Sequence, residues 1–174
     1  VAGVPVLSHV INRGQGAALA TGVRYALDQG AEVLVHFDAD GQHRVEDVER
    51  MVERLNKGDV DIVLGSRVLG GMKFQGFDSL KLLGKRLIDR IFSGVALTDV
   101  HNGLRVMNRR AAELIEISQD RMAHATEIVS EIRRHGLRYE EFPVVSPYTE
   151  YSRANSANKN FLKASFKILK DLVV

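Results

Sequence analysis

Two aspartates one residue apart are the clearest candidates for chemistry in this sequence. They lie in Phe37-Asp38-Ala39-Asp40-Gly41-Gln42-His43, directly after an apolar run. In a tight loop both carboxylates can turn toward one cation, and Gln42 adds a neutral oxygen; such hard oxygen ligands suit Mg²⁺ or Mn²⁺. A cation held there can neutralise the charge that builds on a leaving phosphate. The alternative is a simple Asp-rich turn in which Asp40 caps the next helix.

Other segments offer groups that can bind phosphate. Gly14 and Gly16 precede a predicted helix, where glycines permit close approach of a phosphate to the helix N-terminus or form an ordinary helix-entry turn. Arg67 follows a predicted strand and either binds a phosphate or stays solvated. Arg153 lies in a loop with Tyr148 and Tyr151, which suits a clamp on a phosphate and sugar or a flexible polar connection.

A polar loop from Asp99 to Arg105 contains more polar groups than packing alone explains, although its Asn-Gly pair also suits a turn. Glu127 lies one helical turn after His124, so the two share a face. Glu127 is a candidate general base or a favourable acid in a first helical turn.

Hydrophobic periodicity predicts the elements that position these residues. Strands are expected at 4–10, 32–37, 60–64, 104–107 and 137–145, and helices at 17–29, 45–55, 80–92, 109–117, 126–135 and 161–174. The order indicates an α/β fold with a mostly parallel sheet flanked by helices, in which ligands bind at the carboxyl ends of strands.

Details of the pattern give further expectations. The run 32–37 suits a buried parallel strand. The spacing of helix 45–55 points Val45, Val48 and Met51 inward. The glycines of loop 68–78 favour a mobile segment.

Composition limits the class of protein. The 174 residues fit a single domain spanning 1–174. A net charge of +2, from 24 Lys and Arg against 22 Asp and Glu, is too balanced to indicate a nucleic-acid partner. The absence of cysteine excludes thiolate metal sites and cysteine nucleophiles. No apolar run reaches the roughly 18 residues of a membrane span.

Together, and in this order, the motifs resemble the family 2 glycosyltransferases, which have the GT-A fold. The resemblance is greatest to bacterial polyprenol-phosphate sugar transferases and relatives of dolichol-phosphate mannose synthase. The segment 12–16 resembles the family's Asn-x-Gly-x-Gly, and Asp38 to His43 resembles its Asp-x-Asp metal motif with a following Gln-His. Gly65-Ser66-Arg67, the loop 99–105 and the Tyr-x-x-Tyr-Ser-Arg segment also match.

The resemblance implies an inverting hexosyltransferase that uses a nucleotide-diphosphate sugar. Its metal, Mg²⁺ or Mn²⁺, would be held by Asp38, Asp40 and Gln42. The acceptor would be a lipid phosphate or a glycan in cell-envelope polysaccharide synthesis. Arg67, Arg105 and Arg153 would be the candidates for binding phosphates of the donor or of the lipid acceptor. A hydroxyl acceptor would need a base, for which Glu127 or Asp99 are the candidates, whereas an ionised lipid phosphate would need none.

The same resemblance implies a Rossmann-like nucleotide-diphospho-sugar transferase that lacks its first strands. Family members begin with segments that hold the base and ribose, and nothing here matches them. Residues 4–10 then correspond to the family's third strand, with about 50 residues absent before them. A segment near 151–156 also departs from the Lys-Gly pair that relatives often carry there.

Two alternatives stay open. One is a catalytically inactive GT-A-like fragment or binding domain. The other is a magnesium-dependent phosphohydrolase or nucleotidyltransferase, which would release phosphate or pyrophosphate in place of a nucleoside diphosphate.

The last predicted helix suggests where the protein works. Lysines 159, 163, 167 and 170 lie along one side of it, facing water or an anionic membrane. A membrane contact would place a cytoplasmic enzyme at the inner face of the membrane.

Overall fold

The computed structural model describes residues 3–71, 97–121 and 123–145. Along the chain the elements are α1 (Gln15–Asp28), β1 (Val33–His36), α2 (Val45–Leu55), β2 (Ile62–Ser66), β3 (Arg105–Asn108), α4 (Arg109–Leu114), α5 (His124–Arg134) and β4 (Tyr139–Pro143). These bounds confirm the predicted elements in this part of the chain, with one exception described below. The predicted helices 80–92 and 161–174 lie outside the described residues, as does most of loop 68–78.

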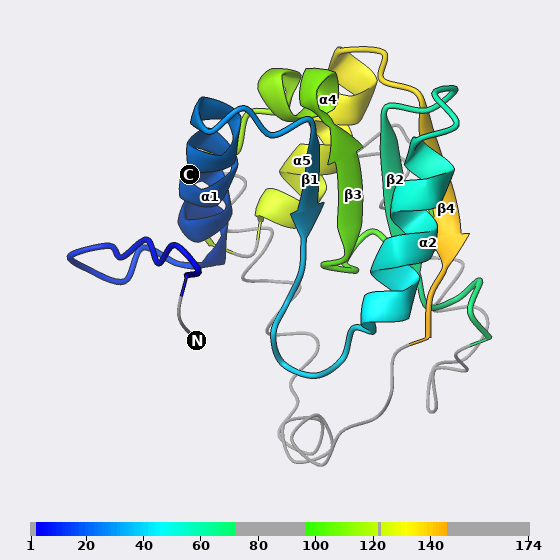
Figure 1. Ribbon diagram of the computed structural model, residues 1–174, viewed down its shortest axis with the longest axis horizontal. Helices are drawn as coiled ribbons and strands as arrows, with labels where there is room; N and C mark the ends of the chain where they lie inside the picture. Colours follow the sequence, from blue (N-terminus) through cyan, green and yellow to red (C-terminus); the bar gives the residue numbers. More distant parts are fainter. Residues whose placement is uncertain (1–2, 72–96, 122, 146–174) are drawn as a thin grey trace.

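The described strands form one sheet in the order β1-β3-β2-β4 (Figure 1). β3 pairs antiparallel with both β1 and β2, and β4 pairs parallel with β2. Three of the strands therefore run in one direction and β3 runs against them. The expectation of a buried parallel position for strand 32–37 is wrong, because the described neighbour of β1 is the antiparallel β3 and Val35 and Phe37 are exposed.

Helices cover both faces of the sheet (Figure 1). On one face, α2 packs through Met51 and Leu55 against Val63 and Val106. On the other, α4 and α5 cover alternate residues of the same strands, with a core of buried residues that includes Leu34, Ile62, Leu64, Met107, Ala111, Ile128 and Ile132. Alternation of side chains in β2 between two apolar layers explains why this strand is buried throughout.

The ends of α2 and α4 are fixed by polar side chains. The buried carboxylate of Asp47 in α2 accepts a hydrogen bond from the backbone nitrogen of Val145 at 3.0 Å, which ties the helix to the end of β4. Asn108 caps α4 by accepting from the backbone nitrogen of Ala111 at 2.8 Å. Val45, predicted to point inward, is 62% exposed because it begins α2 before the helix reaches the sheet.

Residues 4–10 do not form the predicted strand. Their apolar alternation suits one, but among the described residues no strand lies beside them to pair with their backbone. Val6 and Val10 are exposed as a result. This segment instead borders a groove of about 520 Å³ against the outer side of α1. No described helix is long and apolar enough to cross a membrane.

Candidate active site

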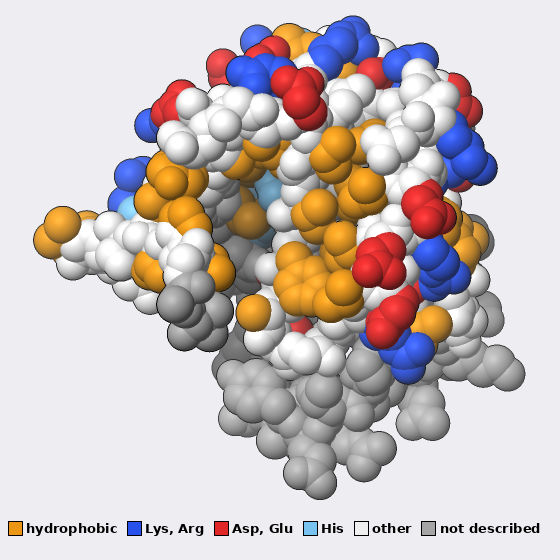
Figure 2. Space-filling view, in the orientation of Figure 1, with side chains coloured by type: hydrophobic (Ala, Val, Ile, Leu, Met, Phe, Trp, Pro, Cys, Tyr) orange, Lys and Arg blue, Asp and Glu red, His pale blue; other side chains and the backbone are white. Residues whose placement is uncertain are grey.

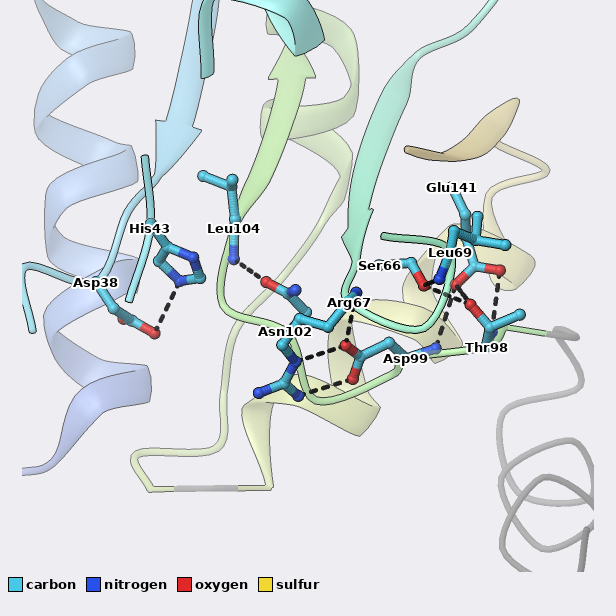
Figure 3. Close-up of polar contacts among 10 residues, drawn as sticks. All are labelled: Asp38, His43, Ser66, Arg67, Leu69, Thr98, Asp99, Asn102, Leu104 and Glu141. Atoms are coloured by element: carbon cyan, nitrogen blue, oxygen red, sulfur yellow. Dashed lines mark hydrogen bonds and ion pairs between the residues drawn. The ribbon is translucent and has the colours of Figure 1, made fainter. Parts of the chain in front are cut away.

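The sheet brings the three predicted loops to one edge. β1 and β2 end there, and the antiparallel β3 begins there, so residues 37–43, 66–67 and 98–104 become neighbours. Gly103 lies so close to Asp38 that an added Cβ atom would be 2.1 Å from Asp38 Oδ2. Figure 3 shows Asp38 with His43 on one side of this edge and Arg67 with Asp99 on the other.

The two aspartates after β1 are oriented by short polar contacts. Gln15, at the start of α1, donates its Nε2 hydrogen to Asp38 Oδ1 at 2.8 Å. Asp40 Oδ1 accepts from the backbone nitrogen of Gln42 at 2.9 Å, which closes the turn, and Gly41 supplies a positive φ of 78° within it. The Asp40 side chain stays exposed.

Neighbouring side chains favour the ionised form of Asp38. The His43 imidazole, with its Nε2 atom 3.8 Å from Asp38 Oδ2, holds the pKa of Asp38 below its usual value. Partial burial acts in the opposite direction, and Arg105 adds to the lowering. The separation of 3.8 Å between these two atoms is longer than an ordinary hydrogen bond.

The chemistry of this turn fits a divalent cation. Asp38 is an ionised, hard oxygen donor, and Asp40 presents a second carboxylate to solvent in the same turn. Among the described residues no group of three or more His, Asp or Glu side chains gathers into a metal site. A Mg²⁺ or Mn²⁺ ion here would therefore take its other ligands from water and substrate phosphates, as Mg²⁺ commonly does. The side-chain oxygen of Gln42 remains a predicted ligand.

Arg67 and Asp99 form a partly buried ion pair. Arg67 Nε donates to Asp99 Oδ2 at 2.7 Å and Arg67 Nη2 to Asp99 Oδ1 at 2.9 Å, so both carboxylate oxygens are engaged. Burial acts to raise the pKa of Asp99, but the Arg67 guanidinium outweighs it and the pKa is lowered. Asp99 is thus ionised and holds Arg67 in place. Since both of its oxygens accept hydrogen bonds from Arg67, this arrangement does not favour the predicted role of Asp99 as a general base.

Arg105 is a buried cation between the two carboxylates. It is 2% exposed, faces His36 across the β1–β3 pairing and acts through its charge on Asp38 and Asp99. Burial lowers the pKa of Arg105 to about 10, so it stays protonated at neutral pH. Its Nη1 atom has no hydrogen-bond partner among the described residues. Binding of a phosphate by Arg105 stays a prediction. The buried Arg105 guanidinium instead helps to lower the pKa of Asp38 through its charge.

Histidine side chains line the floor of a hollow between α1 and the sheet (Figure 2). His36 is 5% exposed, and within the described structure neither of its ring nitrogens has a hydrogen-bond partner. Burial, and next the charge of Arg105, lowers the pKa of His36 to about 3. Burial likewise lowers the pKa of His124, so both imidazoles are neutral beside the Arg105 cation.

Glu127 has contacts that differ from those of a poised base. Its carboxylate accepts hydrogen bonds from the backbone nitrogens of Ser118 and Gln119 and from the Ser118 hydroxyl. It therefore anchors the turn before α5. The catalytic role proposed from its helical position receives no support from this geometry, since both oxygens are already occupied.

Gly14 and Gly16 serve packing within the chain. A Cβ atom at Gly14 would be 2.5 Å from the Asp120 carbonyl oxygen, and one at Gly16 would be 1.9 Å from the Gln119 carbonyl oxygen. The backbone that approaches these glycines is the turn before α5. Binding of a phosphate by this segment stays a prediction. Arg153 lies outside the described residues.

Sequence reasoning missed Glu141, Thr98 and His36. Glu141 accepts hydrogen bonds from the backbone nitrogen and hydroxyl of Thr98, each at 2.8 Å. One signal was available: adjacent glutamates occur inside the predicted strand 137–145, where a charged side chain on the inward face needs partners. The roles of Thr98 and His36 had no such signal, because they depend on which loops meet.

Comparison with known proteins shows which family this chain is similar to. A family model described as glycosyl transferase family 2 matches residues 2–115. An uncharacterised protein of Methanocaldococcus jannaschii is 34% identical, over 99% of this chain and 72% of its own length. The UDP-N-acetylglucosamine–dolichyl-phosphate N-acetylglucosaminyltransferase of Methanococcus voltae is 30% identical, over 98% and 69%. The undecaprenyl-phosphate mannosyltransferase of Micrococcus luteus is 33% identical, over 81% and 60%.

Proposed function

Because the chain belongs to glycosyl transferase family 2, and is thus a glycosyltransferase with the GT-A fold, we propose that it transfers a sugar from a nucleoside-diphosphate sugar to a polyprenol or dolichol phosphate. Two similar proteins bear names that specify lipid phosphate acceptors, dolichyl phosphate in one and undecaprenyl phosphate in the other. The proposal includes a divalent metal ion at Asp38 and Asp40.

The observation that supports a phosphate acceptor most strongly is the state of the two candidate bases. Asp99 is bound on both oxygens by Arg67, and Glu127 is bound by Ser118 and Gln119. A sugar hydroxyl would need a base to remove its proton, and these two carboxylates are the predicted bases within the described part of the chain. A lipid phosphate is already ionised at neutral pH and can attack without a base, so an acceptor of this kind suits the site better than a glycan.

The proposed reaction is a single displacement. An oxygen of the lipid phosphate forms a bond to the anomeric carbon, the bond from that carbon to the diphosphate oxygen breaks, and the nucleoside diphosphate leaves with the electron pair. The configuration at the anomeric carbon inverts. A metal ion bound by Asp38 and Asp40 would neutralise charge on the departing diphosphate. Arg67, fixed by Asp99, binds a phosphate of the acceptor or the donor.

The test is a transfer assay with the full-length protein. We would incubate it with Mn²⁺ or Mg²⁺, a polyprenol phosphate in detergent, and either UDP-N-acetylglucosamine or a nucleoside-diphosphate mannose with a labelled sugar. The expected product is a labelled lipid that partitions into organic solvent, with an equal amount of nucleoside diphosphate. Labelled lipid should not form after chelation of the metal.

Other products would contradict the proposal in distinct ways. Release of inorganic phosphate or pyrophosphate without labelled lipid would indicate a phosphohydrolase or nucleotidyltransferase. Transfer to an added glycan but not to the lipid would keep the glycosyltransferase and reject the acceptor. If the acceptor is a lipid, the enzyme works at the inner face of the membrane, where this substrate is accessible from the cytoplasm.

A further inference from the structure

Glu141 makes a set of contacts that packing of the sheet does not require. It lies in β4, opposite Leu64 of β2, and its side chain reaches the loop that precedes β3. Its carboxylate accepts from the backbone nitrogen of Thr98 at 2.8 Å and 2.9 Å and from the backbone nitrogen of Asp99 at 3.2 Å. The Thr98 hydroxyl donates to it at 2.8 Å. Hydrogen bonds to an ionised carboxylate are among the stronger ones in proteins.

Asp99, whose backbone nitrogen is held by Glu141, in turn binds Arg67. Asp99 accepts from the backbone nitrogen of Arg67 at 3.1 Å and from its guanidinium at 2.7 Å and 2.9 Å. The Asp99 side chain is 6% exposed and that of Arg67 23%. The position of the guanidinium therefore depends on the position of Asp99, and Asp99 depends on Glu141 (Figure 3).

A hydroxyl pair attaches the same loop to the end of β2. The Ser66 and Thr98 hydroxyl oxygens lie 2.6 Å apart, and the backbone nitrogen of Leu69 donates to Ser66 Oγ at 3.2 Å. Because the Thr98 hydroxyl donates to Glu141, the Ser66 hydroxyl must donate to Thr98. Loop 98–99 is thus connected to both β4 and β2 through Thr98.

We propose that Glu141 is a positioning residue that sets the Arg67 guanidinium, through Thr98 and Asp99, for binding a substrate phosphate. The inference rests on the proposed function for the identity of the ligand, a phosphate of donor or acceptor. It adds that affinity for this phosphate is controlled from β4, by a side chain that does not touch the substrate.

The neighbouring Glu140 provides a matched control. It lies in the same strand but pairs with Arg54 of α2, with Arg54 Nε 3.0 Å from each carboxylate oxygen. Glu140→Gln and Glu141→Gln remove the same charge with the same change of shape, one residue apart. Only the second change places an amide NH₂ group against the backbone nitrogens of Thr98 and Asp99.

The first measurement is steady-state transfer. Glu141→Gln should raise KM for the substrate whose phosphate Arg67 binds by about tenfold, the equivalent of one lost charge-assisted hydrogen bond. Its kcat should stay within about twofold, because the proposed effect is on binding. Glu140→Gln should leave both constants close to the wild-type values. A variant that is merely less stable would show a lower active fraction, which reduces kcat and leaves KM unchanged.

The second measurement reports on Arg67 without any turnover. The Nε–H group of an arginine held by a carboxylate gives a sharp, slowly exchanging NMR resonance. In Glu141→Gln this Arg67 resonance and the amide signals of Thr98 and Asp99 should exchange faster with solvent, and in Glu140→Gln they should not. If Glu141→Gln fails to fold, Thr98→Val provides the same test, since it removes only the hydroxyl contacts with Glu141 and Ser66.

The outcomes separate this inference from the proposed function. Unchanged exchange at Arg67, or equal KM values in the two glutamine variants, would overturn the role of Glu141. Absence of transfer by the wild-type protein with every donor would reject the proposed function, and the Arg67 resonance would still decide whether Glu141 positions that side chain.

Discussion

Asp40 is exposed at the turn after β1, and its Oδ1 atom accepts from the backbone nitrogen of Gln42. Asp40→Asn keeps this oxygen and hence the turn, but removes the negative charge that a hard cation requires. We expect transfer to fall by at least about a hundredfold, with an unchanged thermal midpoint. Assays over a range of Mn²⁺ concentrations, together with circular dichroism, would measure both effects.

Asp28→Asn is the control for this change, since Asp28 is an exposed aspartate at the end of α1, whereas the turn is contacted by Gln15 at the start of that helix. It should retain wild-type transfer. Full turnover by Asp40→Asn at saturating metal would show that the ion, if needed, is held elsewhere.

Because His36 is buried, we expect the folded protein to lose stability in acid. Burial lowers its pKa from an ordinary value of 6.5 to about 3, so between these values the unfolded chain binds a proton that the folded protein does not. Stability is therefore lost as the pH falls from about 6.5, by up to roughly 4 kcal/mol when the pH approaches 3. The lowered pKa of the buried His124 acts in the same direction.

Urea denaturation at several pH values in this window would test the role of His36. His36→Leu should weaken the dependence of stability on pH, because a neutral side chain replaces the titrating one. His9 is a half-buried histidine that is hydrogen-bonded to Thr21. His9→Gln should therefore leave the dependence of stability on pH as it is in the wild type. Identical pH profiles for His36→Leu and the wild type would refute the assignment to His36.

At the scale of elements, the contact between the start of α1 and the turn 119–120 determines how α1 sits against the sheet. The Gln15 side chain reaches Asp38 from this helix start, and the backbone nitrogen of Ala17 donates to the Asp120 carbonyl oxygen at 3.2 Å. Gly16 makes that approach possible, since a Cβ atom there would be 1.9 Å from the Gln119 carbonyl oxygen. A change at Gly16 should thus affect both stability and the orientation of Asp38.

Two glycines of the same helix give opposite expectations. Gly16→Ala should lower the free energy of unfolding by about 1–3 kcal/mol, because either α1 or the turn must move. Gly22→Ala should raise it by about 0.5–1 kcal/mol, because open space surrounds that position and alanine favours a helix. Chemical denaturation of the two variants would measure both free energies of unfolding. A similar change at both positions would mean that the close approach of the Gln119 carbonyl to Gly16 is not maintained in solution.

At the scale of the whole molecule, the proposed lipid acceptor requires access to a membrane. The predicted basic helix 161–174 lies outside the described residues, so its membrane contact stays a prediction from the positions of its lysines. Each lysine near an anionic surface contributes about 1 kcal/mol, and salt screens that attraction. We therefore expect the protein to sediment with anionic vesicles at low salt and to be released at high salt.

Neutral vesicles and a variant with Lys163 and Lys167 changed to glutamine complete that experiment. Binding should be weak in both cases. Equal and negligible binding to anionic and neutral vesicles at low salt would leave these lysines as a solvated helix face.

The sequence by itself determined most elements of the described residues and the edge of the sheet at which the candidate site lies. Helix α2 has the predicted bounds, since its apolar spacing and its acidic first turn are local properties of the chain. The motif from Asp38 to His43 could likewise be placed at a strand end, because an apolar run followed by polar residues can be recognised in the sequence without knowing the neighbouring strand.

Only the tertiary structure decided what the polar residues do. Asp99 and Glu127 were equivalent as carboxylates in the sequence, yet one holds Arg67 and the other holds Ser118. Residues 4–10 had the pattern of a strand, but pairing depends on a neighbouring backbone that a local pattern does not contain. Glu141 lies 43 residues from Thr98 along the chain, and the parallel pairing of β4 with β2 brings the two side chains together. Contacts of this kind depend on strand order, which hydrophobic periodicity leaves undetermined.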